Sequence, residues 1–242
     1  MPILVDRFES WLATKGLPLS STELSRMTGI PRRTIASQRA RGRVDPAVVV
    51  AIARAQPLPA YDSLAAVAGL PAMAARRPVR HVEVLSQTAA DDVFAELLRR
   101  TRQSYADALT VVALSKTPVP DGVRQWINAI DPGNIRSNAS ERIGIDTSTL
   151  SAAITSGKVS LDVATLIAEL SDTDPATGLV ATGLITMQEA GWEPDARQRA
   201  LSELDDIELL NLSSTRLTDL QRRTARHLNT QADDRRYWDV LG

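Results

Sequence analysis

The sequence contains no cysteine, which excludes disulfides and thiolate-ligated metal sites. Aromatic residues make up only 4% of the chain, too few for the aromatic-rich faces that stack unpaired bases. The longest apolar stretch, Leu64 to Ala75, is interrupted by Gly69 and Pro71 and is far shorter than the roughly 20 residues of a membrane span. The N-terminus lacks the basic stretch and long apolar run of a secretory signal. These absences predict a cytoplasmic protein without a membrane segment.

Motifs of catalysis are also missing from the sequence. Neither His81 nor His227 belongs to a recognisable motif with acidic and nucleophilic residues, and there is no His-Glu-x-x-His or glycine-rich phosphate loop. Two histidines without cysteine make a zinc site unfavourable. We therefore expect no enzyme activity and no cofactor.

The 242 residues allow one large domain or two of about 100 to 120 residues. With 43% apolar and 24% charged residues, the composition is that of a globular protein. Glycine and proline separate segments of helical length, without the alternating β-branched runs that strands require. The sequence predicts an all-α fold.

The chain contains an internal repeat. Residues 6–66 align without a gap onto residues 121–181, at an offset of 115, and 13 of the 61 positions are identical. Most identical positions carry core or turn residues, among them Trp11/Trp126, Gly29/Gly144 and Gly42/Gly157. What repeats is therefore a fold. We expect an N-terminal domain at 1–70, a helical linker at 71–115, a second domain at 116–190 and a C-terminal helical tail at 191–242.

Capping and periodicity signals predict five helices in the first copy. They cover approximately residues 5–15, 20–28, 31–41, 46–55 and 60–68. Ser20 and Glu23 have the spacing of a capping box, and Asp45-Pro46 is typical of a helix start. The corresponding signals in the second copy are Asn138 with Glu141, Asp146, Gly157, Ser160 and Asp174-Pro175.

The second and third predicted helices are joined by Gly29-Ile30, and Thr34-Ile35 follows near the start of the third. This is the arrangement of a helix-turn-helix, whose second helix can lie in the major groove of DNA. The predicted reading helices are Pro31 to Arg41 and, in the second copy, Asp146 to Ser156. Arginine can grip guanine O6 and N7 with two donors, and shorter polar side chains can reach the same edges. The candidate base-reading residues are Arg32, Arg33, Ser37, Gln38, Thr147 and Ser148.

A second set of side chains is suited to phosphate contacts, which position a protein on the duplex without reading its sequence. The candidate phosphate-contacting residues are Thr34, Arg39, Arg41, Arg43, Thr149 and Lys158.

The two copies differ in charge. Residues 1–70 hold 9 basic and 5 acidic side chains, net +4, whereas residues 116–185 hold 5 and 8, net −3. Where the first copy has Arg32 and Arg33, the second has Thr147 and Ser148. The second copy is either a weaker reader that works through hydroxyls or a domain that has kept the fold and binds something else.

The run from Gly29 to Ile35, the closing Gly42 and the helix Val48 to Ala55 resemble the lambda-repressor-like helix-turn-helix family, in particular the immunity repressors of actinobacterial phages. Residues 144–151 and 174–185 match that pattern better still, and the resemblance covers about half of the chain. It implies sequence-specific binding of double-stranded DNA and repression of transcription, at the nucleoid of a bacterial host cell. One departure is Arg39, where the pattern prefers an apolar residue such as Ile154, so we expect its stem to be partly buried.

Several alternatives stay open at this point. A protein-interaction module, either an antirepressor or an adaptor, would use the same fold without touching DNA; the net charge of −1 suits it, and the basic run from Arg32 to Arg43 argues against it. Two reading heads in one chain predict an asymmetric DNA site covered by a single chain. The cluster Arg76, Arg77, Arg80, His81 is either a second phosphate-contacting strip or a solvated linker.

The C-terminal stretch from Pro194 onward predicts two or three helices whose apolar residues must be buried somewhere. They pack either onto the second copy or into a homodimer interface, for which Tyr237 and Trp238 are candidate anchors. The apolar residues are Leu201, Leu204, Ile207, Leu210, Leu217, Leu220 and Leu228.

Overall fold

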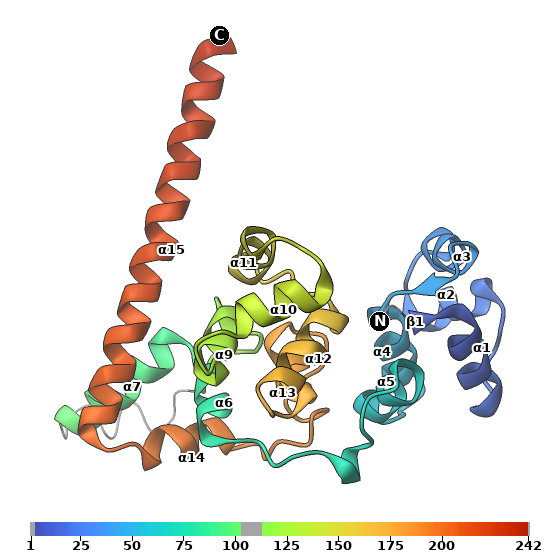
Figure 1. Ribbon diagram of the computed structural model, residues 1–242, viewed down its shortest axis with the longest axis horizontal. Coiled ribbons are helices and arrows are strands. Elements are labelled where there is room, and N and C mark those ends of the chain that lie inside the picture. The colour runs from blue at the N-terminus through green and yellow to red at the C-terminus, as the bar shows by residue number, and fades with distance from the viewer. Residues whose placement is uncertain (1–2, 103–112, 242) are drawn as a thin grey trace.

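The computed structural model describes residues 3–102 and 113–241, with side chains described as far as residue 229. In these ranges the protein is helical apart from one short pair of strands, so the predicted all-α class is confirmed (Figure 1). No helix in the described part is both long and apolar enough to cross a membrane.

Five helices of the first copy form where the sequence predicts them. They are α1 (Val5–Thr14), α2 (Ser21–Thr28), α3 (Arg32–Ala40), α4 (Pro46–Ala55) and α5 (Ala60–Ala68). The apolar spacing of α1 buries Phe8, Trp11 and Leu12. A feature without a sequence signal is the antiparallel pair of β1 (Ile3–Leu4) and β2 (Arg43–Val44), which ties the start of the chain to the segment after α3.

The helix caps of the first copy agree with the predictions except at α2. Asp45 accepts a hydrogen bond from Ala47 N at 2.8 Å and starts α4. Ser20 is the N-cap of α2, but its hydroxyl accepts from Thr22 N at 3.3 Å. The predicted capping box of Ser20 and Glu23 is therefore wrong, because the backbone N–H that donates to Ser20 Oγ is that of Thr22 and not that of Glu23.

The second copy repeats this backbone. Its helices are α9 (Gly122–Ile130), α10 (Ile135–Ile143), α11 (Thr147–Thr155), α12 (Leu161–Leu170) and α13 (Pro175–Ala181). Both bounds of α11 and of α12 lie 115 residues after those of α3 and α4, the offset of the sequence repeat. Glycines at equivalent turns share the left-handed conformation, with φ of 73° at Gly29 and 76° at Gly144. The buried Trp11 and Trp126 confirm the predicted core positions.

One helix start in the second copy departs from its predicted position. Asn138 lies inside α10, because Asp131 Oδ1 accepts from Gly133 N at 2.8 Å and Ile135 N at 3.0 Å and so starts the helix earlier. Asp146 is the N-cap of α11 as predicted, although its side chain makes no cap bond.

The segment between the copies contains the short 3-10 helix η1 (Met73–Ala75), α6 (His81–Ser86) and α7 (Ala90–Thr101). Helix α6 packs on α9, and its buried Val84 and Leu85 belong to the apolar cluster that also contains Leu179 and Val180 of α13. Buried Glu83 of α6 accepts from Thr177 Oγ1 at 2.9 Å, and Thr177 accepts from Trp126 Nε1 at 3.0 Å. Burial raises the pKa of Glu83. These contacts make α6 part of the second copy's packing.

Helices α14 (Ala196–Glu203) and α15 (Asp206–Leu241) follow α13. The C-terminal half of α15 extends away from the other helices (Figure 1). The near half of α15 packs against α7. There, Arg216 donates to Leu85 O at 2.8 Å and Thr88 O at 3.2 Å, and burial lowers the pKa of this guanidinium to about 10. The helix therefore has a polar anchor at the end of α6.

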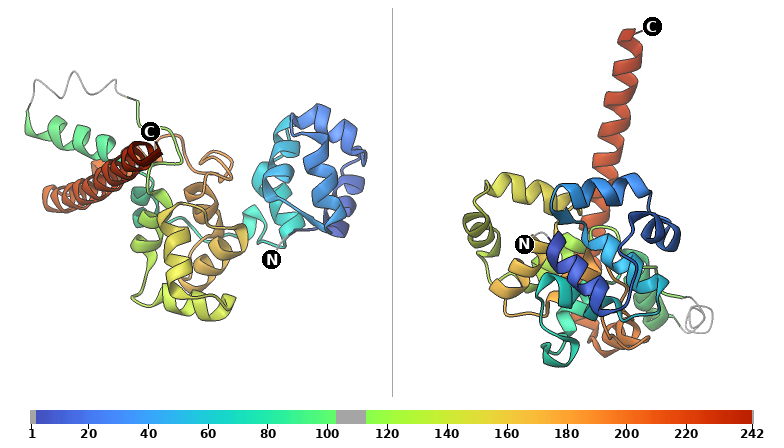
Figure 2. Two further views of the ribbon diagram at one scale, coloured as in Figure 1. Left: turned by 90° about the horizontal axis from the view of Figure 1, so that it is seen from above. Right: turned by 90° about the vertical axis from the view of Figure 1, so that its right-hand side faces the viewer.

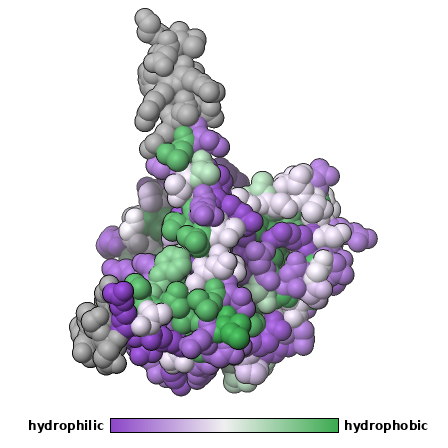
Figure 3. Space-filling model, turned by 90° about the vertical axis from the view of Figure 1, so that its left-hand side faces the viewer, coloured by the Kyte–Doolittle hydropathy of each residue, from purple (hydrophilic) through white to green (hydrophobic). Residues whose placement is uncertain are grey.

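The C-terminal apolar residues are only partly buried within the chain. Leu201 and Leu204 are buried as predicted, whereas Ile207, Leu210, Leu217 and Leu228 are exposed. Figure 3 shows apolar surface gathered on the face that carries α7 and α15. Packing within one chain therefore does not bury these four side chains, because only one side of α15 contacts α7. The side chains of Tyr237 and Trp238 lie outside the described residues.

Candidate nucleic-acid interface

Helix α3 is held by one buried residue and turns its N-terminal end outward. Ile35 is 1% exposed and anchors the inner side of the helix, while Arg32, Arg33 and Thr34 are exposed. The turn before it is closed by Gly29 and by Thr28, whose Oγ1 accepts from Ile30 N at 3.2 Å. The local sequence therefore produces a short helix whose first turn faces solvent.

Helix α11 has the same construction with different side chains. Leu150, the equivalent of Ile35, is fully buried, and Thr147, Ser148 and Thr149 are exposed. Lys158 is exposed in the turn after the helix. The second copy therefore presents hydroxyls where the first presents guanidinium groups.

In α3 and the segment that follows it, the arginines with exposed side chains are Arg32, Arg33, Arg41 and Arg43. Within the described part of the chain, no hydrogen bond or ion pair engages any of these guanidinium groups. Their charges are thus available to an anionic ligand. Ser37 and Gln38 are half-buried one turn further on, and Gln38 Oε1 accepts from Asp45 N at 2.9 Å.

Arg39 is placed differently from the other predicted phosphate contacts. Its Nε donates to Glu9 Oε1 at 3.0 Å, and its Nη1 donates to Ser21 Oγ at 3.2 Å. Its side chain is 22% exposed, and the equivalent Ile154 is buried. The guanidinium therefore links α1, α2 and α3, and the expected burial of its stem is confirmed.

The two helices with exposed N-terminal ends lie on one face of the molecule. Figure 1 shows α3 and α11 at the top of their respective copies, and the right-hand view of Figure 2 shows them at the same height. A single elongated ligand lying across this face would meet both helices.

A hollow separates the copies close to these helices. It is lined from the first copy by Gln38, Arg41, Arg43, Val44, Asp45 and Pro46, and from the second by Ser160, Leu161 and Asp162. Arg41 and Arg43 place positive charge beside it, which suits the sugar-phosphate backbone of a nucleic acid that spans both copies.

The cluster Arg76, Arg77, Arg80 and His81 is neither a uniform phosphate-contacting strip nor a uniformly solvated linker. Arg76 has a side chain that is 6% exposed and pairs with the buried Asp174, so it is neither a solvated linker residue nor a phosphate contact. Arg77 pairs with Asp172, and His81 Nε2 lies 2.9 Å from Ala200 O. A buried guanidinium of this kind has no signature in the local sequence.

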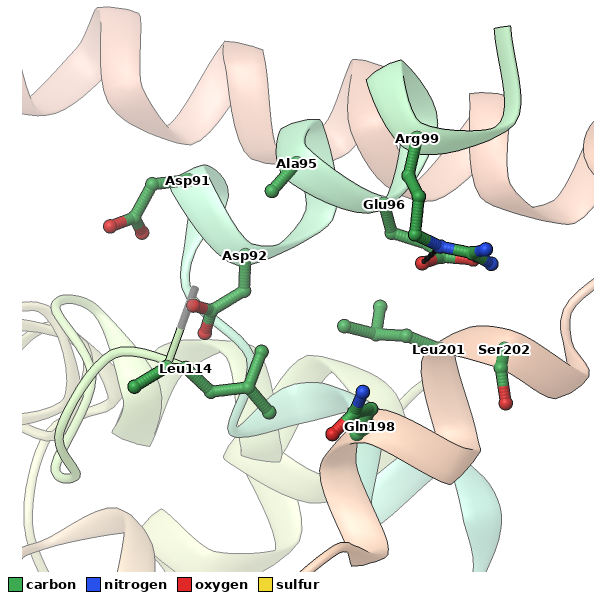
Figure 4. A pocket seen from close by; sticks show the side chains of 10 residues that line it. Asp91, Asp92, Ala95, Glu96, Arg99, Leu114, Gln198, Leu201 and Ser202 are labelled. Carbon is green, nitrogen blue, oxygen red and sulfur yellow. Dashed lines mark hydrogen bonds and ion pairs between the residues drawn. The ribbon is translucent and has the colours of Figure 1, made fainter. Parts of the chain in front are cut away.

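A pocket lies between α7 and α14 and contains several carboxylates (Figure 4). Asp92 Oδ1 accepts from Ser115 N at 2.8 Å, and Asp91 Oδ2 accepts from Ser115 Oγ at 2.9 Å. Glu96 accepts from Arg99, which lowers the pKa of this carboxyl. The carboxylates thus serve contacts within the protein, and no group of metal-ligating side chains is found in residues 3–102 and 113–229.

Fold and site together define an all-α protein in which two copies of one five-helix arrangement expose equivalent helices on a shared face. Comparison of the chain with protein-family models, with curated proteins and with solved structures finds no match.

Proposed function

We propose that the protein is a sequence-specific, double-stranded-DNA-binding transcriptional regulator, a phage-type immunity repressor of the lambda-repressor-like kind that works at the nucleoid of a bacterial host cell. Helix α3 reads the major groove through Arg32 and Arg33, with Ser37 and Gln38 one turn further along. Helix α11 adds a second, weaker contact through Thr147 and Ser148. The proposal includes no catalysis and no cofactor.

The observation that carries this proposal is the free guanidinium pair at the exposed start of α3. Arg32 and Arg33 belong to α3, which lies on the face shared with α11 (Figure 1), and neither makes an ion pair within the described chain. An arginine that folding does not use can donate two hydrogen bonds to a guanine edge. Arg41, Arg43 and Lys158 are exposed near the ends of the two helices, where phosphates would lie. Arg39 is excluded from this set because its guanidinium holds Glu9.

The experiment that tests the proposal is selection of bound sequences from random duplex DNA by the purified protein at low salt. We expect one enriched motif, and we expect Arg32→Ala with Arg33→Ala to lose it. Arg199→Ala is a matched control, because it removes an exposed arginine from α14 at the opposite end of the body. If the folded protein enriches no motif, the proposal is refuted, and the alternative of a protein-interaction module, an antirepressor or adaptor, is favoured.

A second partner, another copy of this chain, is favoured by the exposed apolar residues of α15. Leu210, Leu217 and Leu228 are between 47% and 57% exposed on a helix of 36 residues. A homodimer through the C-terminal helices would cover them. Sedimentation of the free protein and of its DNA complex separates this arrangement from one chain covering one asymmetric site.

A further inference from the structure

One of the contacts between the two copies joins equivalent positions of the repeat. In the hollow beside α3, Asp45 and Pro46 face Ser160 and Leu161, which are the same positions 115 residues later. At the other end of the interface, Arg76 Nη1 donates to Ala190 O at 2.7 Å, and Met73 Sδ approaches Gly191. These residues lie outside the aligned ranges 6–66 and 121–181, in the segments that follow α5 and α13. In the hollow, each copy therefore contributes the same part of the repeat, the start of α4 in one and the start of α12 in the other.

A contact in which the same positions of both copies meet is typical of an isologous interface, in which the two copies are related by a two-fold axis. In a head-to-tail arrangement the end of one copy would instead meet the beginning of the next. Figure 1 agrees with the two-fold relation: α4 and α5 face α12 and α13 in the middle, while α1 and α9 lie on the outer sides. Helices α3 and α11 then point the same way from positions on either side of the axis.

A buried ion pair holds this arrangement at its base. Arg76 Nε donates to Asp174 Oδ2 at 2.7 Å, and its guanidinium lies 4.5 Å from the centre of the Tyr61 ring. Tyr61 belongs to α5, and Asp174 is the N-cap of α13, so one side chain touches the last helix of each copy. A buried charge is tolerated only while its partner stays in place, so this contact permits one relative orientation.

A second link lies between α4 and the segment after α13. Arg54 donates to both carboxylate oxygens of Glu189, at 2.7 Å and 2.8 Å. A two-bond fork of this kind restrains rotation as well as distance. Arg76 and Glu189 belong to the segments after α5 and after α13, and both segments run along the side away from α3 and α11 (Figure 1).

We propose that the protein reads a composite DNA site of two unlike half-sites in inverted orientation, at a spacing set by the Arg76–Asp174 contact. This inference rests on the proposed function. Inversion follows from the two-fold relation, because two-fold related heads meet the antiparallel strands of a duplex in the same way. The half-sites differ because Arg32 and Arg33 read one and Thr147 and Ser148 read the other.

The fixed spacing can be tested without DNA. The chain has no cysteine, so spin labels at Ala40→Cys and Thr155→Cys, equivalent exposed positions on α3 and α11, report a single distance. We expect a narrow distance distribution, broadened by Arg76→Ala and left narrow by Arg77→Ala, which breaks the neighbouring exposed pair with Asp172. Arg76→Lys is a milder variant, since lysine keeps the charge without the planar fork. A distribution that is broad before any substitution, or unchanged by both Arg76 variants in folded protein, overturns the role of Arg76.

The orientation is tested on the duplex recovered by selection. Reversing one half-site in place, to make a direct repeat, should weaken binding at least about tenfold, the loss of roughly one base contact. Inserting five base pairs, about half a helical turn, should do the same, and Arg76→Ala should reduce that penalty while Arg77→Ala does not. Equal binding of inverted and direct arrangements refutes the inference. If no duplex is enriched, the proposed function fails and the DNA part of this inference fails with it, while the label distances still decide the geometry.

Discussion

Replacing Arg32 and Arg33 together by alanine should abolish most of the sequence preference while leaving the fold intact. Both side chains are exposed at the first turn of α3 and contribute no ion pair to the described chain. The inner side of the helix is held by Ile35, which the substitutions leave untouched. The loss of binding should therefore come from the missing DNA contacts alone.

The size of the effect follows from the contacts that two arginines can make. A bidentate arginine contact to guanine is worth about 1–3 kcal/mol, so the pair should contribute on the order of 2–5 kcal/mol. At about 1.4 kcal/mol per factor of ten, this is roughly a 30-fold to few-thousand-fold weaker complex. Thr147 and Ser148 form only neutral hydrogen bonds, about 0.5–1.5 kcal/mol each, and their alanine variants should lose less.

Titration of labelled duplex at fixed salt, with circular dichroism of each variant, measures this difference. The selected sequence and a scrambled duplex should become nearly equivalent for Arg32→Ala with Arg33→Ala. The opposite ranking, with Thr147 and Ser148 costly and Arg32 and Arg33 silent, would show that the second copy is the main reading head. The difference in net charge between the copies would then not indicate which copy reads DNA.

Three further predictions concern salt, packing and pH. Arg41→Ala should weaken binding to all duplexes alike and reduce the salt slope by about one unit, measured by titration at several salt concentrations. Gly178→Ala should destabilise the protein by about 1–3 kcal/mol, because the added Cβ would lie 2.7 Å from the ring of Trp126. Because Trp126→Phe shortens the ring that the new Cβ would meet, adding Gly178→Ala to that variant should cost less stability than adding it to the native protein, as measured by denaturant unfolding. Equal costs in the two backgrounds would contradict the clash. The hydrogen bond from Arg54 lowers the pKa of Glu189, so the stability from this pair is present above the ordinary carboxyl pKa and lost as pH falls through the lowered one. Unfolding midpoints should therefore fall more steeply below about pH 4 for the native protein than for Glu189→Gln; parallel curves would contradict this.

The sequence by itself determined the helices and their repetition. Helix ends depend on interactions within a few residues, such as the left-handed Gly29 and the cap at Asp45, and these recur 115 residues later. Apolar residues three and four apart must share a buried face, which located Trp11 and its counterpart Trp126 in the two cores. The start of α10 was missed because Asp131, four residues before Ile135, supplies the decisive bond.

Only the tertiary structure decided which charges remain for a ligand. The sequence presents Arg32, Arg39 and Arg76 as comparable basic side chains, yet Arg39 holds Glu9 and Arg76 holds Asp174 across 98 positions of the chain. No spacing rule connects residues so far apart, because their proximity depends on how whole helices pack. The same holds for the two-fold relation of the copies: an internal repeat is compatible with either a two-fold or a head-to-tail arrangement, and the contacts that distinguish them form only when the chain folds.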